Sequence, residues 1–145
     1  MPTIIKLRGV EKSGKTTTLL LLIDKLKQLG AKQIVCKPVQ GSPNDLTAEL
    51  DYNGKKIGIV TAGDDSTLLD NGTKEISKNC DIYIFACRTR GSSTEWIDNT
   101  YSHCSMITCE KWFILSKNSI QPIDALRTLA NENQAWFLIH LISAL

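Results

Sequence analysis

An eight-residue segment near the start of the chain constrains the fold more than any other feature. It reads Gly-Val-Glu-Lys-Ser-Gly-Lys-Thr over residues 9–16 and matches the pattern G-x-x-x-x-G-K-[ST] at every fixed position. A β-branched run at residues 3–8 leads into it, and an amphipathic helical pattern follows from Gly14. A strand, a glycine-containing turn and a helix in this order direct backbone N–H groups toward an anion at the helix N-terminus. The alternative is an ordinary turn that happens to precede a helix.

Individual residues of this segment acquire defined roles if the anion is a chain of phosphates. The Lys15 ammonium is placed to reach the β- and γ-phosphates, and the Thr16 hydroxyl is placed to ligate the accompanying Mg²⁺. We therefore predict a catalytic role for Lys15 and a metal-binding role for Thr16. The predicted nucleotide-binding set is Gly9, Val10, Glu11, Lys12, Ser13, Gly14, Lys15, Thr16 and Thr17.

Two acidic residues at the end of an apolar segment are candidates for the second magnesium ligand. Residues 58–63 end in Thr-Ala-Gly, and Asp64 and Asp65 follow directly. A carboxylate at the tip of a neighbouring strand would face the metal, so Asp64 is the first candidate for metal binding and catalysis. Asp65 is the second candidate. The alternative for Asp65 is that it caps the helix expected to follow it.

Two arginines follow the most apolar segment of the chain. Arg88 and Arg90 come directly after residues 81–87, at the sheet edge where open α/β proteins bind their ligands. Their guanidinium groups are predicted to hold phosphoryl oxygens and to stabilise charge that develops during transfer. The alternatives are a solvated basic loop and a contact with nucleic-acid phosphate.

Strand and helix patterns alternate along the chain. Asn53-Gly54 between residues 46–52 and 55–61 predicts a β-hairpin with a type I′ turn. The apolar residues 81–87 indicate a central strand covered on both faces. Other strands are expected at residues 3–8, at residues 33–37 before Pro38, and at residues 111–116. Helices are expected from Gly14 to Gly30, from Asp65 or Ser66 to Asn79, from Ser92 or Ser93, and from Pro122 onward.

This order of elements predicts the class of fold. It indicates an α/β protein, a three-layer α/β/α sandwich whose sheet is mostly parallel with one antiparallel β-hairpin. Residues 1–145 are expected to form a single domain. The last helix is expected to bury one face, consisting of Ile123, Leu126, Ala130, Phe137 and Leu141.

Composition argues against several other classes of protein. The chain is 42% hydrophobic and 22% charged, which is typical of globular proteins. Its net charge of +2 argues against the concentrated basic face of a nucleic-acid binder. The longest apolar run, residues 19–23, is far shorter than the roughly 20 residues that span a bilayer, and the start shows no signal-peptide pattern. Five irregularly spaced cysteines indicate reduced thiols, so we expect a cytoplasmic protein without a membrane partner.

Two stretches within the first 42 residues resemble known families. Residues 8–19 resemble the phosphate loop of the molybdopterin-guanine dinucleotide biosynthesis accessory family, with Ser-Gly-Lys-Thr-Thr after a central lysine. Residues 36–42, Cys-Lys-Pro-Val-Gln-Gly-Ser, resemble a Lys-Pro-Val segment of dethiobiotin synthetases. Both families belong to the P-loop (Walker A) NTPase superfamily, so the resemblance implies a P-loop NTPase fold. The second one also implies that Lys37 lies beside the substrate and the transferred phosphoryl group.

These observations lead to two expected functions. The first is an enzyme that uses Mg²⁺ and a nucleoside triphosphate, either a hydrolase or a small phosphotransferase with an unidentified acceptor. ATP is favoured over GTP because the chain lacks the guanine-reading motif Asn-Lys-x-Asp. The acceptor would lie at the hairpin around residues 53–54 or at a loop formed by residues 38–45. The second is a nucleotide-dependent interaction module that dimerises, or signals to a protein partner, with little turnover.

Overall fold

The structure is a computed structural model that describes residues 1–115 and 123–145. Its elements follow one another in the order predicted from the sequence. They are β1 (Thr3–Arg8), α1 (Lys15–Gln28), β2 (Lys32–Val39), β3 (Ser42–Tyr52), β4 (Lys55–Val60), α2 (Ser66–Thr73), β5 (Ile82–Cys87), α3 (Ser92–Thr100), β6 (Ser105–Glu110) and α4 (Ile123–Ala144). Pro122, the predicted first residue of the last helix, lies outside the described residues.

The described strands form one six-stranded sheet in the order β2-β3-β4-β5-β1-β6. The pairings β4–β5, β5–β1 and β1–β6 are parallel, whereas β2–β3 and β3–β4 are antiparallel. A mostly parallel sheet is therefore confirmed. Because the parallel strands end at one edge, the residues that follow β1, β4 and β5 meet there.

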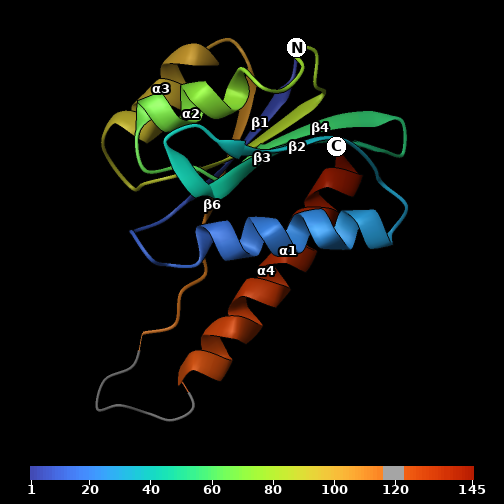
Figure 1. The fold of residues 1–145 in the computed structure, drawn as a ribbon. Coiled ribbons are helices and arrows are strands. Elements are labelled where there is room, and N and C mark those ends of the chain that lie inside the picture. Colours follow the sequence, from blue (N-terminus) through green and yellow to red (C-terminus); the bar gives the residue numbers. More distant parts are fainter. Residues whose placement is uncertain (116–122) are drawn as a thin grey trace.

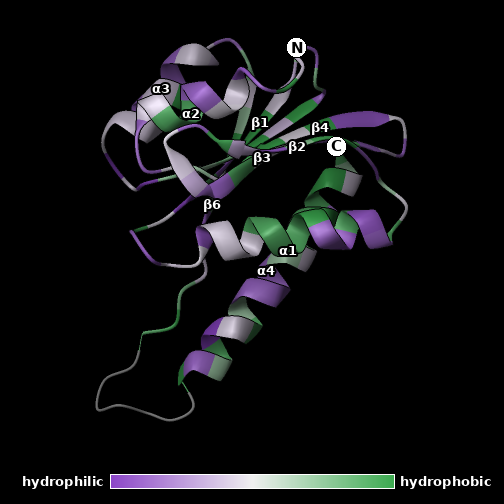
Figure 2. Ribbon diagram, viewed as in Figure 1, coloured by the Kyte–Doolittle hydropathy of each residue, from purple (hydrophilic) through white to green (hydrophobic). Residues whose placement is uncertain are grey.

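Helices cover both faces of this sheet, which is compatible with the predicted three-layer fold. Figure 1 shows α1 and α4 on one side of the strands and α2 and α3 on the other. Successive residues of β1 face opposite layers, because strand side chains alternate. Ile5 and Leu7 pack under α1 and α4, while Ile4 packs under α2 and α3. Figure 2 shows hydrophobic residues concentrated on the strands between the two helix layers, and every residue of β5 is buried, as predicted.

The antiparallel part contains two hairpins rather than one. The predicted turn at Asn53 and Gly54 is confirmed, since both φ angles are positive (52° and 78°), as a type I′ turn requires. A second hairpin joins β2 to β3 through Gln40 and Gly41. The prediction that the strand ends before Pro38 and that residues 38–45 form a loop was therefore wrong. Proline fits within β2 because this is an edge strand, which has one side without a partner strand.

The last strand also lies elsewhere than predicted. The sequence indicates a strand at residues 111–116, but β6 ends at Glu110 and the described residues 111–115 are not in a strand. The register places Thr3 opposite Ser105 and Arg8 opposite Glu110. As the outermost strand, β6 is only partly buried, so it lacks the continuous apolar pattern that marks a central strand.

Two helices differ from their predicted extent or orientation. Helix α2 ends at Thr73, not Asn79, because the chain turns back to the sheet, where the Ser77 N–H donates to Glu49 Oε1 at 2.7 Å. The buried face of α4 differs from the predicted one, and both Leu126 and Phe137 are exposed. Only the C-terminal half of this helix is buried, through Gln134, Ala135, Leu138, Ile139 and Ile142. Among the described residues, no helix is long and apolar enough to cross a bilayer.

Candidate functional site

The segment between β1 and α1 forms a compact turn. The Gly9 N–H donates to the Cys87 carbonyl at 3.1 Å, and the Ser13 N–H donates to the Val10 carbonyl at 3.3 Å. Lys12 and Gly14 have positive φ angles of 59° and 97°. At Gly14 this φ disfavours any side chain, and an added Cβ would also lie 2.6 Å from Asn131 Oδ1 of α4, so the Asn131 side chain would have to shift. This glycine therefore lets α4 pack against the start of α1.

The N-terminus of α1 is left free by this turn. No side chain of the described residues caps the helix, in contrast to α2, whose Leu68 N–H is bound by Asp65. The first N–H groups of a helix lack intrahelical partners and favour negative charge. The Ser13 hydroxyl lies next to them, and this residue is 4% exposed. Within the described chain its Oγ atom has no hydrogen-bond partner. Buried hydroxyl groups rarely stay unpaired, but this oxygen is itself enclosed by the turn, so it lies beside the helix N-terminus without opening onto solvent.

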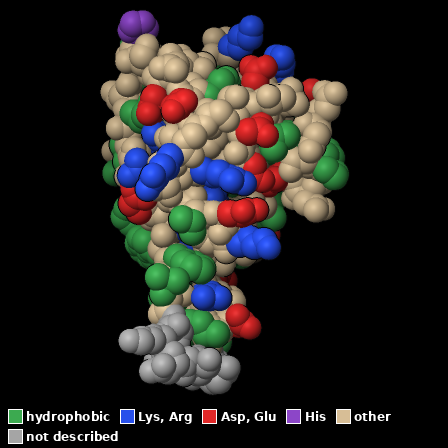
Figure 3. Space-filling model, turned by 90° about the vertical axis from the view of Figure 1, so that its left-hand side faces the viewer, with side chains coloured by type: hydrophobic (Ala, Val, Ile, Leu, Met, Phe, Trp, Pro, Cys, Tyr) green, Lys and Arg blue, Asp and Glu red, His purple; other side chains and the backbone are tan. Residues whose placement is uncertain are grey.

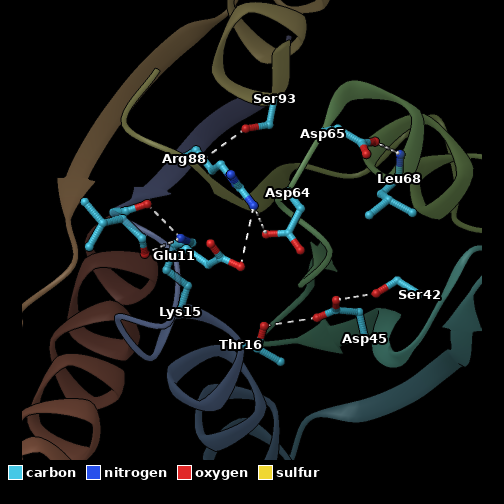
Figure 4. A network of polar contacts seen from close by, with 12 residues as sticks. Glu11, Lys15, Thr16, Ser42, Asp45, Asp64, Asp65, Leu68, Arg88 and Ser93 are labelled. Carbon is cyan, nitrogen blue, oxygen red and sulfur yellow. Dashed lines mark hydrogen bonds and ion pairs between the residues drawn. The ribbon is translucent and has the colours of Figure 1, made fainter. Parts of the chain in front are cut away.

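Lys15 lies inside the turn. Its side chain is buried, and its Nζ atom donates to the carbonyl oxygens of Gly9 at 2.7 Å and Val10 at 2.9 Å (Figure 4). Burial lowers the pKa of this ammonium, and the negative charges of Asp64 and Glu11 partly oppose that effect. A partly desolvated ammonium of this kind interacts strongly with any anion that enters.

A cavity of about 350 Å³ opens beside this turn. Its wall contains most of the predicted binding set, whereas Gly9 and Val10 contribute only their carbonyl contacts to Lys15. The opposite wall comes from Asp45 near the start of β3 and from residues that follow β4. The lining residues are Glu11, Lys12, Ser13, Gly14, Lys15, Thr16, Thr17, Asp45, Thr61, Gly63 and Asp64.

The carboxylate beside Thr16 is Asp45, not the predicted Asp64. The Thr16 Oγ1 atom donates to Asp45 Oδ1 at 3.0 Å (Figure 4). The same oxygen accepts from Thr61 Oγ1 at 2.8 Å, and Asp45 Oδ2 accepts from Ser42 Oγ at 2.7 Å. Sequence reasoning missed Asp45 because residues 38–45 were expected to form a loop. The alternation of Leu46, Ala48 and Leu50 extends back toward this residue and was the available signal.

Asp64 lies on the same cavity but faces a different partner. Its Oδ1 atom is 3.5 Å from Arg88 Nη2, and Glu11 Oε1 is 3.9 Å from the same nitrogen. The ends of β4 and β5 approach closely at Gly63, where an added Cβ would lie 2.3 Å from the Ala86 carbonyl oxygen. This close approach brings Asp64 and Arg88 together, and the Arg88 N–H is held by Ser93 Oγ at 3.0 Å.

Three other predicted residues lie apart from this cavity. Asp65 caps α2, where its Oδ1 atom accepts from the Leu68 N–H at 2.9 Å, as the alternative interpretation expected. Lys37 lies on the edge strand β2, pairs with Glu75 at 3.3 Å and is not part of this cavity wall, so its place beside a substrate stays a prediction. Arg90 is exposed in the turn before α3 and, within the described chain, lies outside the cavity wall.

Lys111 is a buried neighbour of the site that sequence reasoning missed. It follows β6, and a Cβ on Gly9 would lie 2.8 Å from its own Cβ. The side chain is 7% exposed, and its Nζ atom donates to the Trp112 carbonyl. Burial and the positive charge of Lys15 lower the pKa of Lys111 to about 8. Nothing in the local sequence distinguishes this lysine from the exposed ones.

We expect Lys111→Met to stabilise the fold near neutral pH. Because the folded pKa lies below the unfolded value, the burial cost of the charged form is present below pH 8 and is relieved as pH rises toward 10.5. Methionine keeps the contact with Gly9 and removes the charge, which raises the free energy of unfolding at pH 7 by about 2 kcal/mol. Urea unfolding at pH 7 and pH 9.5 measures the effect. The difference between variant and wild type should shrink at the higher pH, and a constant difference would contradict this account.

Comparison with protein-family models, curated proteins and solved structures gave no match for this chain. The geometry of the cavity is therefore the observation from which a function can be proposed.

Proposed function

We propose that the cavity binds the phosphates of a Mg²⁺-bound nucleoside triphosphate, and that the protein is an NTP hydrolase or a small phosphotransferase. One juxtaposition carries this proposal. The uncapped N-terminus of α1 and the buried Lys15 side chain border one cavity, and the unpartnered Ser13 hydroxyl lies enclosed beside them. These groups are all hydrogen-bond donors, and their number suits a multiply charged oxyanion. The cavity volume is at the lower end for ligand sites, which suits the phosphate chain, with the base outside it.

Lys15 would exchange its partners when phosphate binds. In the structure its ammonium is satisfied by two loop carbonyls, at 2.7 and 2.9 Å. Bonds between an ammonium and phosphate oxygens are charge-assisted and therefore stronger than bonds to neutral carbonyls. The same atom would then stabilise negative charge on the transferred phosphoryl group.

The residues beside Lys15 fit a magnesium ion. Mg²⁺ is usually held by one or two carboxylates, with water and phosphate oxygens completing its shell. The Thr16 hydroxyl and the Asp45 carboxylate provide oxygen donors 3.0 Å apart on the cavity. When bound, Mg²⁺ would neutralise charge on the β- and γ-phosphates. Thr61 and Ser42 would keep Asp45 oriented through their hydrogen bonds.

A nucleotide-dependent interaction module is the second candidate. The observation that favours it is the edge strand β2, which is exposed along most of its length and leaves Ile34 47% exposed. Unpaired edge strands can pair with another chain. ATP remains our first choice of nucleotide, because the chain lacks Asn-Lys-x-Asp.

Thermal unfolding with a panel of ligands tests the proposal. We expect Mg-ATP and Mg-tripolyphosphate at millimolar concentration to raise the unfolding temperature by several degrees, because both occupy the phosphate site. The shift with Mg-GTP, compared with that of Mg-ATP, shows which base is preferred. The shift with Mg-ADP shows how much the terminal phosphate contributes to binding. Unchanged unfolding temperatures with every ligand would reject the phosphate site. Phosphate release by the isolated protein then indicates an enzyme, whereas nucleotide-dependent dimerisation without release indicates a module.

A further inference from the structure

The Arg88 guanidinium lies between two acidic side chains at the rim of the cavity. Its Nη2 atom is 3.9 Å from Glu11 Oε1 and 3.5 Å from Asp64 Oδ1 (Figure 4). The Arg88 Nε atom is buried and, among the described residues, has no hydrogen-bond partner. The guanidinium is therefore held by long ion pairs, and its donors are not saturated.

Glu11 belongs to the segment that is proposed to hold phosphate. It lines the cavity, and its negative charge also acts on Lys15. Figure 3 shows acidic and basic side chains next to one another on the side of the molecule where this segment lies. A carboxylate at this position has the same sign of charge as the ligand. It therefore competes with phosphate for the cationic groups of the site.

The position of Arg88 indicates which phosphate of the nucleotide competes with Glu11. The Thr16–Asp45 pair and Asp64 lie on the same cavity, and Asp64 forms an ion pair with Arg88. Mg²⁺ held by Thr16 and Asp45 would neutralise charge on the phosphate chain. A terminal phosphate on the Asp64 side of this cavity would lie within reach of Arg88. A diphosphate lacks this group and leaves the Glu11–Arg88 pair in place.

We propose that Glu11 is a specificity-determining residue, whose carboxylate competes with the terminal phosphate for Arg88. It thereby lowers the affinity for the nucleoside triphosphate relative to the diphosphate. This inference rests on the proposed function. The competition is modest in size, because the pair is partly exposed and its charges are screened by solvent.

Calorimetric titration of Glu11→Gln with Mg-ATP and Mg-ADP tests the inference. We expect the Mg-ATP affinity to rise about fivefold and the Mg-ADP affinity to change by less than about twofold. Glu75→Gln is the matched control. It removes the same charge from an exposed pair with Lys37, outside the cavity, and should change neither affinity.

A second variant shows whether Arg88 carries the effect. In an Arg88→Gln background, Glu11→Gln should raise the Mg-ATP affinity by less than about twofold, because Arg88 is absent and only the weaker effect of the Glu11 charge on Lys15 is left. Equal gains for both nucleotides, or a gain of about fivefold that persists in this background, would overturn the inference while leaving the phosphate site intact. A wild-type protein that binds neither nucleotide would overturn both the site and the inference.

Discussion

Lys15→Met should lower the affinity for Mg-ATP by about a hundredfold. The Lys15 ammonium is the most buried cation on the cavity, and the proposed phosphate contact is charge-assisted. Removing one partner of a buried charged pair leaves the other partner without compensation, which commonly costs two orders of magnitude in affinity. Methionine keeps most of the aliphatic length, so the turn between β1 and α1 keeps its packing. Calorimetric titration of the purified variant measures the loss directly.

The same variant should remain folded. Burial lowers the pKa of Lys15, so the folded protein bears a cost for the charged form at neutral pH, and methionine removes this cost. That gain offsets the lost bonds to the Gly9 and Val10 carbonyls. Lys12→Met, at an exposed position of the same segment, is the control and should lower affinity by only about threefold. Wild-type affinity in a folded Lys15→Met protein would show that the phosphates bind elsewhere.

Local patterns predicted the parts of the fold that depend on local interactions. The turn at Asn53 and Gly54 requires two positive φ angles, and few residue pairs adopt them readily. Helix α1 ends where predicted because Gly30 adopts a φ of 102°, which lets the Ala31 N–H reach the Leu26 carbonyl at 2.9 Å. In both cases the determining interactions lie within six residues.

The incorrect predictions concern the two edge strands of the sheet and the extent or buried face of two helices. Strand β6 is an edge strand and is only partly covered, so its sequence lacks a strong apolar pattern. Strand β2 is the other edge strand and can therefore continue through Pro38. The buried face of α4 was predicted wrongly because only part of this helix is covered, and the sequence does not indicate where the cover ends. Apolar residues at helical spacing identify a helix, but they do not show which part of its apolar face is covered by the rest of the protein.

In the candidate site too, the residues of one continuous segment were predicted, whereas residues contributed by other strands were missed. Residues 11–17 line the cavity, and they come from one continuous motif. Asp45 was missed because the start of β3 was expected to be a loop, although the apolar alternation of this strand extends toward it. Lys111 reaches the site through the pairing of its N–H with the Arg8 carbonyl, far away in the sequence, so no local pattern marks it. Arg88 and Asp64 were selected because each follows an apolar strand. Their ion pair places them together, whereas their chemical roles remain predictions.

Asp45→Asn should abolish the magnesium dependence of nucleotide binding. Among the described residues, Asp45 holds the carboxylate that accepts from Thr16, and asparagine preserves its size while removing the charge. An amide oxygen is a much poorer ligand for Mg²⁺ than a carboxylate, because the ion prefers hard anionic oxygen. We expect the Mg-ATP affinity to fall at least tenfold, toward the affinity measured in excess chelator, and phosphate release to fall about a hundredfold. The asparagine amide group can still donate to Ser42 and its oxygen can accept from Thr16, so the fold should persist.

Asp64→Asn is the informative comparison, because it tests the ligand that the sequence favoured. Both carboxylates lie on the same cavity and both substitutions remove one charge, so a general electrostatic effect would appear equally in the two variants. If the structure identifies the metal ligand correctly, Asp64→Asn keeps its magnesium dependence. It should bind Mg-ATP as tightly as the wild type or more tightly, because it weakens the pairing that occupies Arg88. Loss of magnesium dependence in Asp64→Asn, together with its retention in Asp45→Asn, would reverse the assignment. The ion would then lie beside Arg88, away from the hydroxyl of Thr16.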